Sequence, residues 1–446
     1  MHEISRRRFL ATTALSTGVV AAVRPNGVAG QTSGWFNEPY PRVLERYLAI
    51  DNVCAYASLT LAGDGTLLAS IRNRPVHSGP DVDIECWASQ DGGKFWKLRG
   101  IAAPHAQGTS QEQSAIGIAH DGSIVVIART DKYEGRVRRP LPLRVCRSHD
   151  GGRTWEWTNS VKPPTDVYHL TPFGNVVRCP NGVLAAVAFD VRWREEITRK
   201  IGHTPDVMPI GEAAEAACYV FFSKNDGRTW GDAALLGAPG AHGRWFGSTS
   251  ILRLRSGRWL AAVDKWSHVA LFASEDEGRT WTERGPLTVG GMRQRPGHLI
   301  QLADERVLLT YGLRERDHPG HPNDMPGFVP GTLFRAPLPP GAPIAETELP
   351  ARKPYEDEEW YQQYGWGKGM SHGPGCITIR LSTNEGQTWL APRLVTHLEE
   401  STDGSYPASA QLADGSIVTV YHANRTPGHY RFHMGVVRWK LENPNS

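Results

Sequence analysis

The sequence predicts an all-β fold, a β-propeller of six blades, and three observations support this prediction. The 446 residues include 47 Gly, 32 Pro and 15 Trp, a composition that favours strands and turns over helices. One short motif occurs five times, and a hairpin pattern occurs six times. Internal repeats of this kind are the sequence signature of an architecture built from similar structural units.

The first repeat is Ser-x-Asp/Asn-x-Gly-x-Thr-Trp, with small departures. The Asp or Asn side chain can hydrogen-bond the backbone of its own turn, and Gly supplies a conformation that other residues resist. The Trp packs the hairpin against its neighbours. The five copies are Ser89–Trp96, Ser148–Trp155, Ser223–Trp230, Ser274–Trp281 and Ser382–Trp389.

The second repeat consists of two apolar runs joined by a tight turn, which indicates a β-hairpin. In the first copy, Ala57 to Leu61 is followed by Leu67 to Ile71. Six hairpins and five motifs together predict six four-stranded blades. The run from Met434 to Leu441 either completes the last blade or closes the ring with the N-terminal segment. The turns lie at Asp64-Gly65, Asp121-Gly122, Asn181-Gly182, Ser256-Gly257, Asp304-Glu305 and Asp414-Gly415.

The N-terminus predicts a twin-arginine export signal over residues 1–30, followed by the propeller over residues 31–446. Ser5-Arg6-Arg7-Arg8-Phe9-Leu10 precedes a mild apolar run that ends near Val23. That run is shorter than the ~20 strongly apolar residues that a membrane span needs. We therefore expect a periplasmic or secreted protein with no membrane span.

Charge and cysteine usage exclude several other classes of protein. The formal charge of +3 resides in the N-terminal segment, and the remainder is neutral, which argues against nucleic acid as a partner. Six cysteines allow many pairings. Because twin-arginine cargo is generally folded before export, buried free thiols are the favoured interpretation. We expect no cofactor and a monomer.

A long insertion, residues 317–375, interrupts the fifth blade. It is rich in Pro, Gly and aromatic residues, including Pro339-Pro340-Gly341 and Trp366. Because it follows the second strand of its blade, it should emerge where the second strands end. Long loops inside a compact domain are usually functional or disordered, and the aromatic content favours an ordered lid or the wall of a subsite.

One end of the predicted ring collects polar residues. The first strand of each blade begins at this end, which we call the mouth, and the second strand returns to it. Several arginines and acidic residues fall there, which is typical of a site for an anionic sugar. Four histidines fall near it without metal-ligand spacing, so we expect no metal. They are His77, His169, His298 and His422.

The five motifs resemble the Asp-boxes of the sialidase (neuraminidase) superfamily, and the resemblance extends from about residue 45 to 440. In that family the boxes lie at the end of the propeller away from the active site, so their acidic residues are scaffold. The resemblance implies a Tyr nucleophile assisted by a Glu, an Asp acid/base and several arginines on the substrate carboxylate.

The family roles transfer to particular residues. Tyr406, in Ser405-Tyr406-Pro407-Ala408, resembles the nucleophile, and Arg295 resembles one of the arginines. Asp81 resembles the acid/base, with Asp83 as its rival. Ala55 and Ser248 stand where the family has an Arg and the assisting Glu. Arg72, Arg74 or Arg244 could replace the arginine and Glu112 could assist, and the other candidates for substrate binding are His77, His298 and Arg314.

These features predict an exported, exo-acting glycoside hydrolase that cleaves a terminal, acidic, sialic-acid-like sugar from a glycan. Two alternatives remain open. One is a lyase on a uronate-containing polysaccharide, with Tyr406 or a His as base. The other is a glycan-binding propeller without catalytic activity.

Overall fold

The computed structural model describes residues 38–53, 56–75, 80–134, 137–161, 170–193, 214–240, 246–265, 268–288, 293–314, 344–346, 375–398, 405–423 and 432–443. Within these ranges the chain is all-β and contains no helix, hence none that could cross a membrane. The predicted export signal lies outside the described residues. So does the 317–375 insertion, apart from residues 344–346 and Gly375.

The strands form antiparallel series in chain order. One sheet holds β2 (Ser58–Leu61), β3 (Leu67–Arg72), β4 (Ile84–Ser89) and β5 (Lys97–Ala103). Two further four-stranded sheets hold β14 (Thr249–Arg253), β15 (Trp259–Asp264), β16 (Val269–Ser274) and β17 (Thr282–Pro286), and β18 (Arg293–Gln301), β19 (Val307–Arg314), β21 (Gly375–Ser382) and β22 (Arg393–His397).

An eight-stranded sheet consists of two such series, which one parallel pair, Asn175 with Ile116, joins edge to edge. The first series is β6 (Thr109–Ile118), β7 (Ile124–Glu134), β8 (Val137–Ser148) and β9 (Glu156–Val161). The second series is β10 (Leu170–Arg178), β11 (Leu184–Trp193), β12 (Ala214–Ser223) and β13 (Asp232–Gly237).

The N-terminal strand closes the structure. β1 (Tyr40–Asp51) pairs antiparallel with β25 (His433–Glu442), which follows β23 (Ser405–Gln411) and β24 (Ile417–Ala423) in the last sheet. The short β20 (Ile344–Glu346) runs parallel to β1 at the outer edge of that sheet. Nε of Arg46 on β1 donates to the Tyr421 hydroxyl on β24 at 2.7 Å. The sequence left two possibilities open for the last strand, and β25 combines them: it pairs with β24 inside the last series and with the N-terminal β1.

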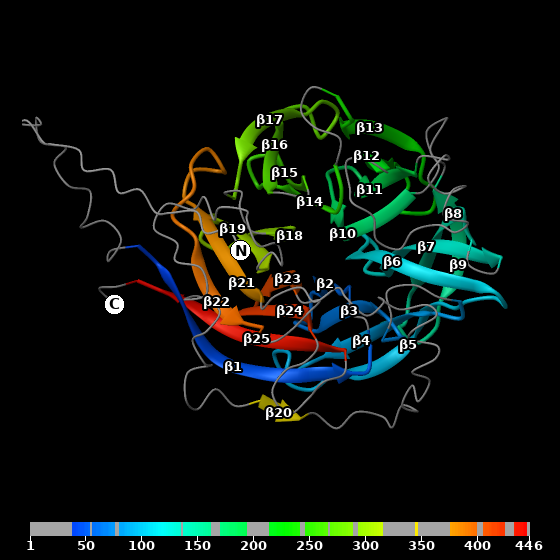
Figure 1. The fold of residues 1–446 in the computed structure, drawn as a ribbon, viewed down its shortest axis with the longest axis horizontal. Helices are drawn as coiled ribbons and strands as arrows, with labels where there is room; N and C mark the ends of the chain where they lie inside the picture. The colour runs from blue at the N-terminus through cyan, green and yellow to red at the C-terminus, as the bar shows by residue number, and fades with distance from the viewer. Residues whose placement is uncertain are drawn as a thin grey trace, which may run out of the picture.

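The sheets curl around a common centre (Figure 1). The first strand of each series contacts the first strand of the next: β2 lies against β6, β6 against β10, and so on through β14, β18 and β23. β23 in turn contacts β2, so these contacts form a closed ring. The predicted hairpin turns all occur, and the turn residue Glu305 adopts a positive φ of 71° where the five other turns use Gly.

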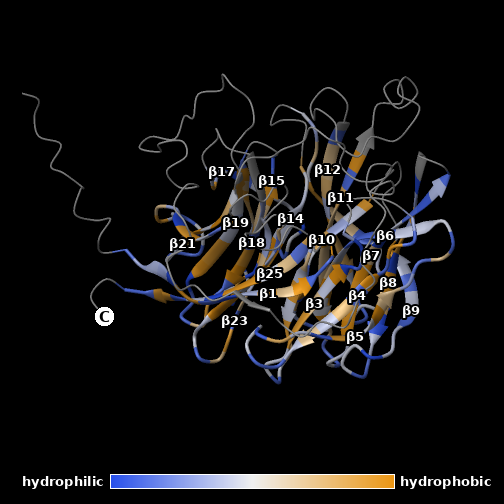
Figure 2. Ribbon diagram, turned by 60° about the horizontal axis from the view of Figure 1, so that its bottom comes forward, coloured by the Kyte–Doolittle hydropathy of each residue, from blue (hydrophilic) through white to orange (hydrophobic). Residues whose placement is uncertain are grey.

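The core lies between neighbouring sheets. Apolar side chains from the faces of adjacent series interlock, and Trp87, Trp259 and Trp439 are fully buried there. Figure 2 shows the strands mostly in the hydrophobic colour and many turns in the hydrophilic one. The five described cysteines, Cys86, Cys146, Cys179, Cys218 and Cys376, are buried free thiols. Burial raises the pKa of each of them to about 12.

The five repeated motifs share one hydrogen-bond pattern. In each, the Ser hydroxyl accepts from the Gly amide at 2.8–3.0 Å, and the Trp ring Nε1 donates to the Gly carbonyl at 2.8–3.1 Å. The carboxylate of Asp226 in the third motif accepts from the amides of His120 and Asp121 beside a hairpin turn. That motif and the hairpin turns therefore lie at the same end of the ring.

Candidate functional site

The strand register brings the predicted mouth positions together. At the end of the ring opposite the hairpin turns, Ser58 pairs with Ser70, Leu170 with Asp190, and Ser405 with His422. The start of each first strand thus lies beside the end of the second strand, as the sequence pattern predicts. The buried polar residues at this end include Asp131, Asp190 and Asp264.

Tyr406 belongs to an aromatic group at this end. Its ring meets the Tyr56 ring edge-on, with 4.6 Å between centroids, and lies 6.4 Å from the His422 ring. His422 in turn stacks on Phe432 at 5.0 Å with an interplanar angle of 9°. His422 is fully buried, whereas Tyr406 is only partly buried. Tyr406 is therefore held by packing but keeps access to solvent.

The backbone at Tyr406 is strained. Ser405 has φ of +93° and Tyr406 has φ of +50°, a region that residues with a side chain adopt rarely. Such conformations cost of order 1–3 kcal/mol each and occur mainly where the surrounding structure imposes them, often at functional sites. They interrupt the regular pairing of β23 with β24 between Ser405 and Ala408, which re-aims the Tyr406 side chain.

Arg72 and Glu112 form a buried ion pair beside this group. Nη2 of Arg72 lies 3.2 Å from Oε2 of Glu112, and the Tyr133 hydroxyl donates to Oε1 of Glu112 at 2.9 Å. Ser58 of β2 pairs with Ser70 of β3; Tyr56 precedes Ser58 by two residues, and Arg72 follows Ser70 by two. The aromatic group and the ion pair therefore flank one hairpin.

This burial concerns two candidate residues from the sequence, and their predicted roles stay predictions. Arg72 was a candidate to bind the substrate carboxylate, but its side chain is 1% exposed and faces Glu112. Glu112 was a candidate to assist Tyr406, but its carboxylate is occupied by Arg72 and Tyr133. The pair links β3 to β6, because a buried charge needs its partner close by.

Asp81 and Asp83 lie in the loop between β3 and β4 and differ in exposure. The Asp81 side chain is 49% exposed, and its carboxylate oxygen lies 3.7 Å from Nε2 of His105. Its amide donates to the Thr109 carbonyl, and its own carbonyl accepts from Nε of Arg74 at 3.1 Å. The Asp83 carboxylate is nearly buried and accepts from His105 and Asn73.

The remaining predicted residues divide into two groups. Arg295 and Arg314 occupy β18 and β19, where Arg295 pairs with Gly312 and Arg314 with Arg293, and their side chains lie outside the described part of the structure. Arg244, His77, His169 and Ala55 lie outside the described residues altogether.

His298 is buried rather than lining the mouth. Its side chain is 1% exposed, and Nδ1 accepts from the Ser409 amide at 3.2 Å. Burial lowers its pKa from 6.5 to about 4, because the interior disfavours the charged imidazolium. A neutral, enclosed imidazole that accepts a backbone amide links β18 to β23, and this geometry does not favour contact with a substrate.

His105 and Tyr133 were missed by the sequence analysis. Tyr133 reaches Glu112 from β7, and His105 reaches Asp83 and Asp81 from the connection between β5 and β6. Neither lies at a repeated position, so the periodic patterns carry no signal for them. The nearest signal is Pro104-His105, which stands just before a predicted first strand.

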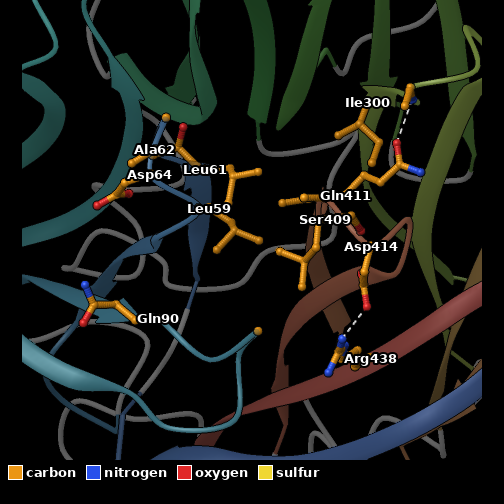
Figure 3. Close-up of a pocket in the computed structure, with 18 of the residues that line it drawn as sticks. Leu59, Leu61, Ala62, Asp64, Gln90, Ile300, Ser409, Gln411, Asp414 and Arg438 are labelled. Atoms are coloured by element: carbon orange, nitrogen blue, oxygen red, sulfur yellow. Dashed lines mark hydrogen bonds and ion pairs between the residues drawn. The ribbon is translucent and has the colours of Figure 1, made fainter.

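A cavity of about 970 Å³ opens at the other end of the ring. Turn residues such as Asp64 and Asp414 line it together with Leu59 and Gln411 (Figure 3). Tyr406 is five residues before Gln411 on β23, which corresponds to about 17 Å along a strand. The cavity is therefore distinct from the mouth. Among the described residues, no group of three or more His, Cys, Asp or Glu side chains could hold a metal ion.

No protein-family model and no curated protein sequence matches the chain. Solved structures do. A Dyadobacter fermentans protein of unknown function matches at a TM-score of 0.63 and 17% identity, over 91% of this chain and 100% of that one. The intramolecular trans-sialidase of Ruminococcus gnavus, solved with oseltamivir carboxylate, matches at 0.51 and 13%, over 92% and 95%.

A third match is the sialidase of Trypanosoma rangeli, solved as a covalent intermediate with 2,3-difluorosialic acid. Its TM-score is 0.53 at 11% identity, over 87% of this chain, and the chain spans about half (54%) of that protein. At such low identities the likeness concerns the fold. The chain therefore shares the β fold of these sialidase structures.

Proposed function

We propose that this chain is an exported, exo-acting glycoside hydrolase that removes a terminal acidic sugar, sialic-acid-like in its carboxylate, from glycans. The proposal treats each four-stranded series as one blade, which gives six blades with β1 as the fourth strand of the last. It also takes residues 1–30 as a twin-arginine signal, so the enzyme works in the periplasm or outside the cell.

The observation that carries the proposal is the setting of Tyr406. A partly exposed phenol stands on strained backbone at the mouth, between Tyr56 and His422. A neutral phenol suits an anionic sugar, because a carboxylate nucleophile would be repelled by the carboxylate of the substrate. Tyr406 is assigned as the nucleophile.

Asp81 is the better of the two acid/base candidates. Its carboxylate is half-exposed, as proton transfer to a bound glycan requires, whereas the Asp83 carboxylate is occupied by His105 and Asn73. Arg74, whose Nε donates to the Asp81 carbonyl, and Arg295 on β18 are assigned to bind the sugar carboxylate. Glu112 and Arg72 support the wall of the site as an ion pair.

The first test is release of free sialic acid from a fluorogenic sialoside by wild type and by Tyr406→Phe. We expect turnover that Tyr406→Phe lowers by at least about 10³-fold, because the attacking oxygen is lost. Tyr40→Phe is the matched control, since the Tyr40 hydroxyl donates to Glu442 on the exposed surface. Turnover unchanged by Tyr406→Phe would refute the role of Tyr406.

If sialosides are not hydrolysed, the two alternative functions, a lyase and a glycan-binding propeller, become the ones to test. A lyase on uronate-containing polysaccharide would release an unsaturated, ultraviolet-absorbing product, which hydrolysis does not form. A binding propeller would retain the glycan with no product, and its affinity would survive Tyr406→Phe. One panel of sialosides and uronate polysaccharides, assayed for free sugar and for absorbance, separates the three outcomes.

A further inference from the structure

His105 is fixed in one orientation by Asp83. Oδ1 of Asp83 accepts from the His105 backbone amide and from its ring Nδ1, each at 2.7 Å. A ring nitrogen that faces a carboxylate oxygen at this distance carries the proton. The other ring nitrogen, Nε2, is then free to act as an acceptor while the imidazole is neutral. Asp83 therefore determines both the tautomer and the direction of the ring.

Asp83 is itself immobilised. The residue is 8% exposed. Its second oxygen accepts from Nδ2 of Asn73 at 3.0 Å, and its amide donates to Oδ1 of Asn73 at 2.9 Å. With both oxygens bonded, Asp83 orients its neighbour and does not reach a substrate.

The free nitrogen of His105 points toward Asp81. Nε2 lies 3.7 Å from Oδ1 of Asp81, just beyond a hydrogen bond. The Asp81 backbone is held by the Thr109 carbonyl and the Arg74 guanidinium, with φ of +61°. Hydrogen bonds in catalytic sites are often long before substrate binds.

We propose that Asp83, His105 and Asp81 form a chain that keeps one proton at the acid/base carboxyl, with His105 as the positioning residue. The neutral imidazole accepts from the protonated Asp81 carboxyl, and the imidazolium donates to the ionised one. In both arrangements the Asp81–His105 pair holds the same proton. Among the described residues, the charged groups near His105 include Asp81, Asp83 and Arg74 on the β3–β4 loop and Arg144 of β8, whose Nη1 donates to the Pro104 carbonyl.

In the reaction, which rests on the proposed function, the proton balance closes. In the first step the Tyr406 oxygen bonds the anomeric carbon as the bond between that carbon and the glycosidic oxygen breaks. Asp81 gives its proton to the leaving oxygen, so the alcohol departs neutral, and the phenol proton passes to solvent, to which Tyr406 is partly exposed. In the second step water attacks the anomeric carbon and the bond to the Tyr406 oxygen breaks; the Asp81 carboxylate takes the proton of the water, and the phenolate regains a proton from solvent. The sugar is released and the chain is restored.

NMR spectroscopy tests the hydrogen-bonded chain of Asp83, His105 and Asp81 without any substrate. The full-length protein, labelled with ¹⁵N-histidine, is compared as wild type, His105→Gln and Asp81→Asn. Asn adopts positive φ readily, so Asp81→Asn keeps the loop. We expect His105 in the Nδ1–H tautomer at neutral pH and an Nε2 resonance that moves on Asp81→Asn. An Nε2–H tautomer, or an Nε2 resonance indifferent to Asp81→Asn, would overturn the proposal.

A kinetic test examines the role of the chain in catalysis. General acid catalysis matters most when the leaving group is a poor one. We expect His105→Gln to lower kcat by at least about tenfold on a sialyl-oligosaccharide and by less than about threefold on an aryl sialoside. Equal losses on both substrates would show that His105 has a structural role only.

His149→Gln is the matched control. Its Nε2 lies 3.7 Å from the Glu156 carboxylate, the same distance as in the His105–Asp81 pair, but in the exposed scaffold of the second motif. We expect no change in either assay. If wild type hydrolyses neither substrate, the proposed function fails. The ¹⁵N spectra still show whether Asp83, His105 and Asp81 form the proposed hydrogen-bonded chain.

Discussion

The Arg72 guanidinium and the Glu112 carboxylate lie 3.2 Å apart with side-chain exposures of only 1% and 5%. The pair joins the end of β3 to the start of β6, so it ties one series to the next at the mouth. The Tyr133 hydroxyl bonds the second carboxylate oxygen. Charges this deeply buried are stable only as a bonded set, and the loops that carry Asp81 and His105 rest beside it.

Glu112→Gln should destabilise the fold. Removing one member of a buried ion pair leaves the other charge poorly compensated, which costs about 3–5 kcal/mol. Urea denaturation measures the change in the free energy of unfolding. Glu275→Gln breaks the more exposed pair with Arg258 and should cost less than about 1 kcal/mol. Equal effects of the two substitutions would show that the Arg72–Glu112 pair contributes no more than a surface pair.

His298 should make stability depend on pH. Its pKa is about 4 in the folded state and 6.5 when unfolded, so the unfolded state binds more protons between these values. Stability is therefore complete above pH 6.5 and falls, by about 3 kcal/mol, as the pH drops to 4. His298→Gln keeps an acceptor for the Ser409 amide but does not titrate. Its free energy of unfolding should vary less with pH in this window, and an unaltered pH dependence would contradict the assignment.

The strand framework was predictable because its signals are local. A turn such as Asp64-Gly65 sits between two apolar runs, and the repeated Ser, Gly and Trp of each motif satisfy one another within one loop. These contacts join residues that are close in the sequence, so they can be predicted from short motifs. The closure by β1 was only one of two open possibilities, because Tyr40 and Glu442 pair across nearly the whole chain.

The sequence predicted which residues lie at the candidate site, but not which of their side chains contact one another. Register places Tyr406 and Glu112 at the mouth. It does not say that Glu112 faces Arg72, because that contact depends on how two series approach each other. His105 lies in a connection without periodicity, and its role depends on the exposure difference between Asp81 and Asp83.

Asp276→Asn should be tolerated and Asp276→Ala should not. Asp276 accepts from the Thr280 amide and hydroxyl, bonds that lower its pKa to about 2. The chain itself uses Asn225 and Asn384 at this motif position, with equivalent bonds to Thr. We expect a loss of about 1–2 kcal/mol for Asp276→Ala and much less for Asp276→Asn, measured by urea denaturation. Comparable losses would show that the carboxylate charge itself is required.

Ser405→Gly should stabilise the protein. Ser405 is fully buried at φ of +93°, and its hydroxyl finds no hydrogen-bond partner in the described part of the chain. Glycine relieves the strained φ and removes the unpaired hydroxyl. These two effects outweigh the greater conformational freedom of glycine in the unfolded state, so the free energy of unfolding should rise by about 1 kcal/mol.

Ser110→Gly is the matched control for this comparison. Ser110 is equally buried and its hydroxyl is likewise unpaired among the described residues, but it lies in β6 without a positive φ. There glycine should cost about 0.5–1 kcal/mol, because it adds entropy to the unfolded chain without relieving strain. Comparing the Tm values of the two variants separates the effect of backbone strain on stability from the effect of removing a buried hydroxyl. Equal shifts in Tm would mean that the backbone beside Tyr406 stores no strain.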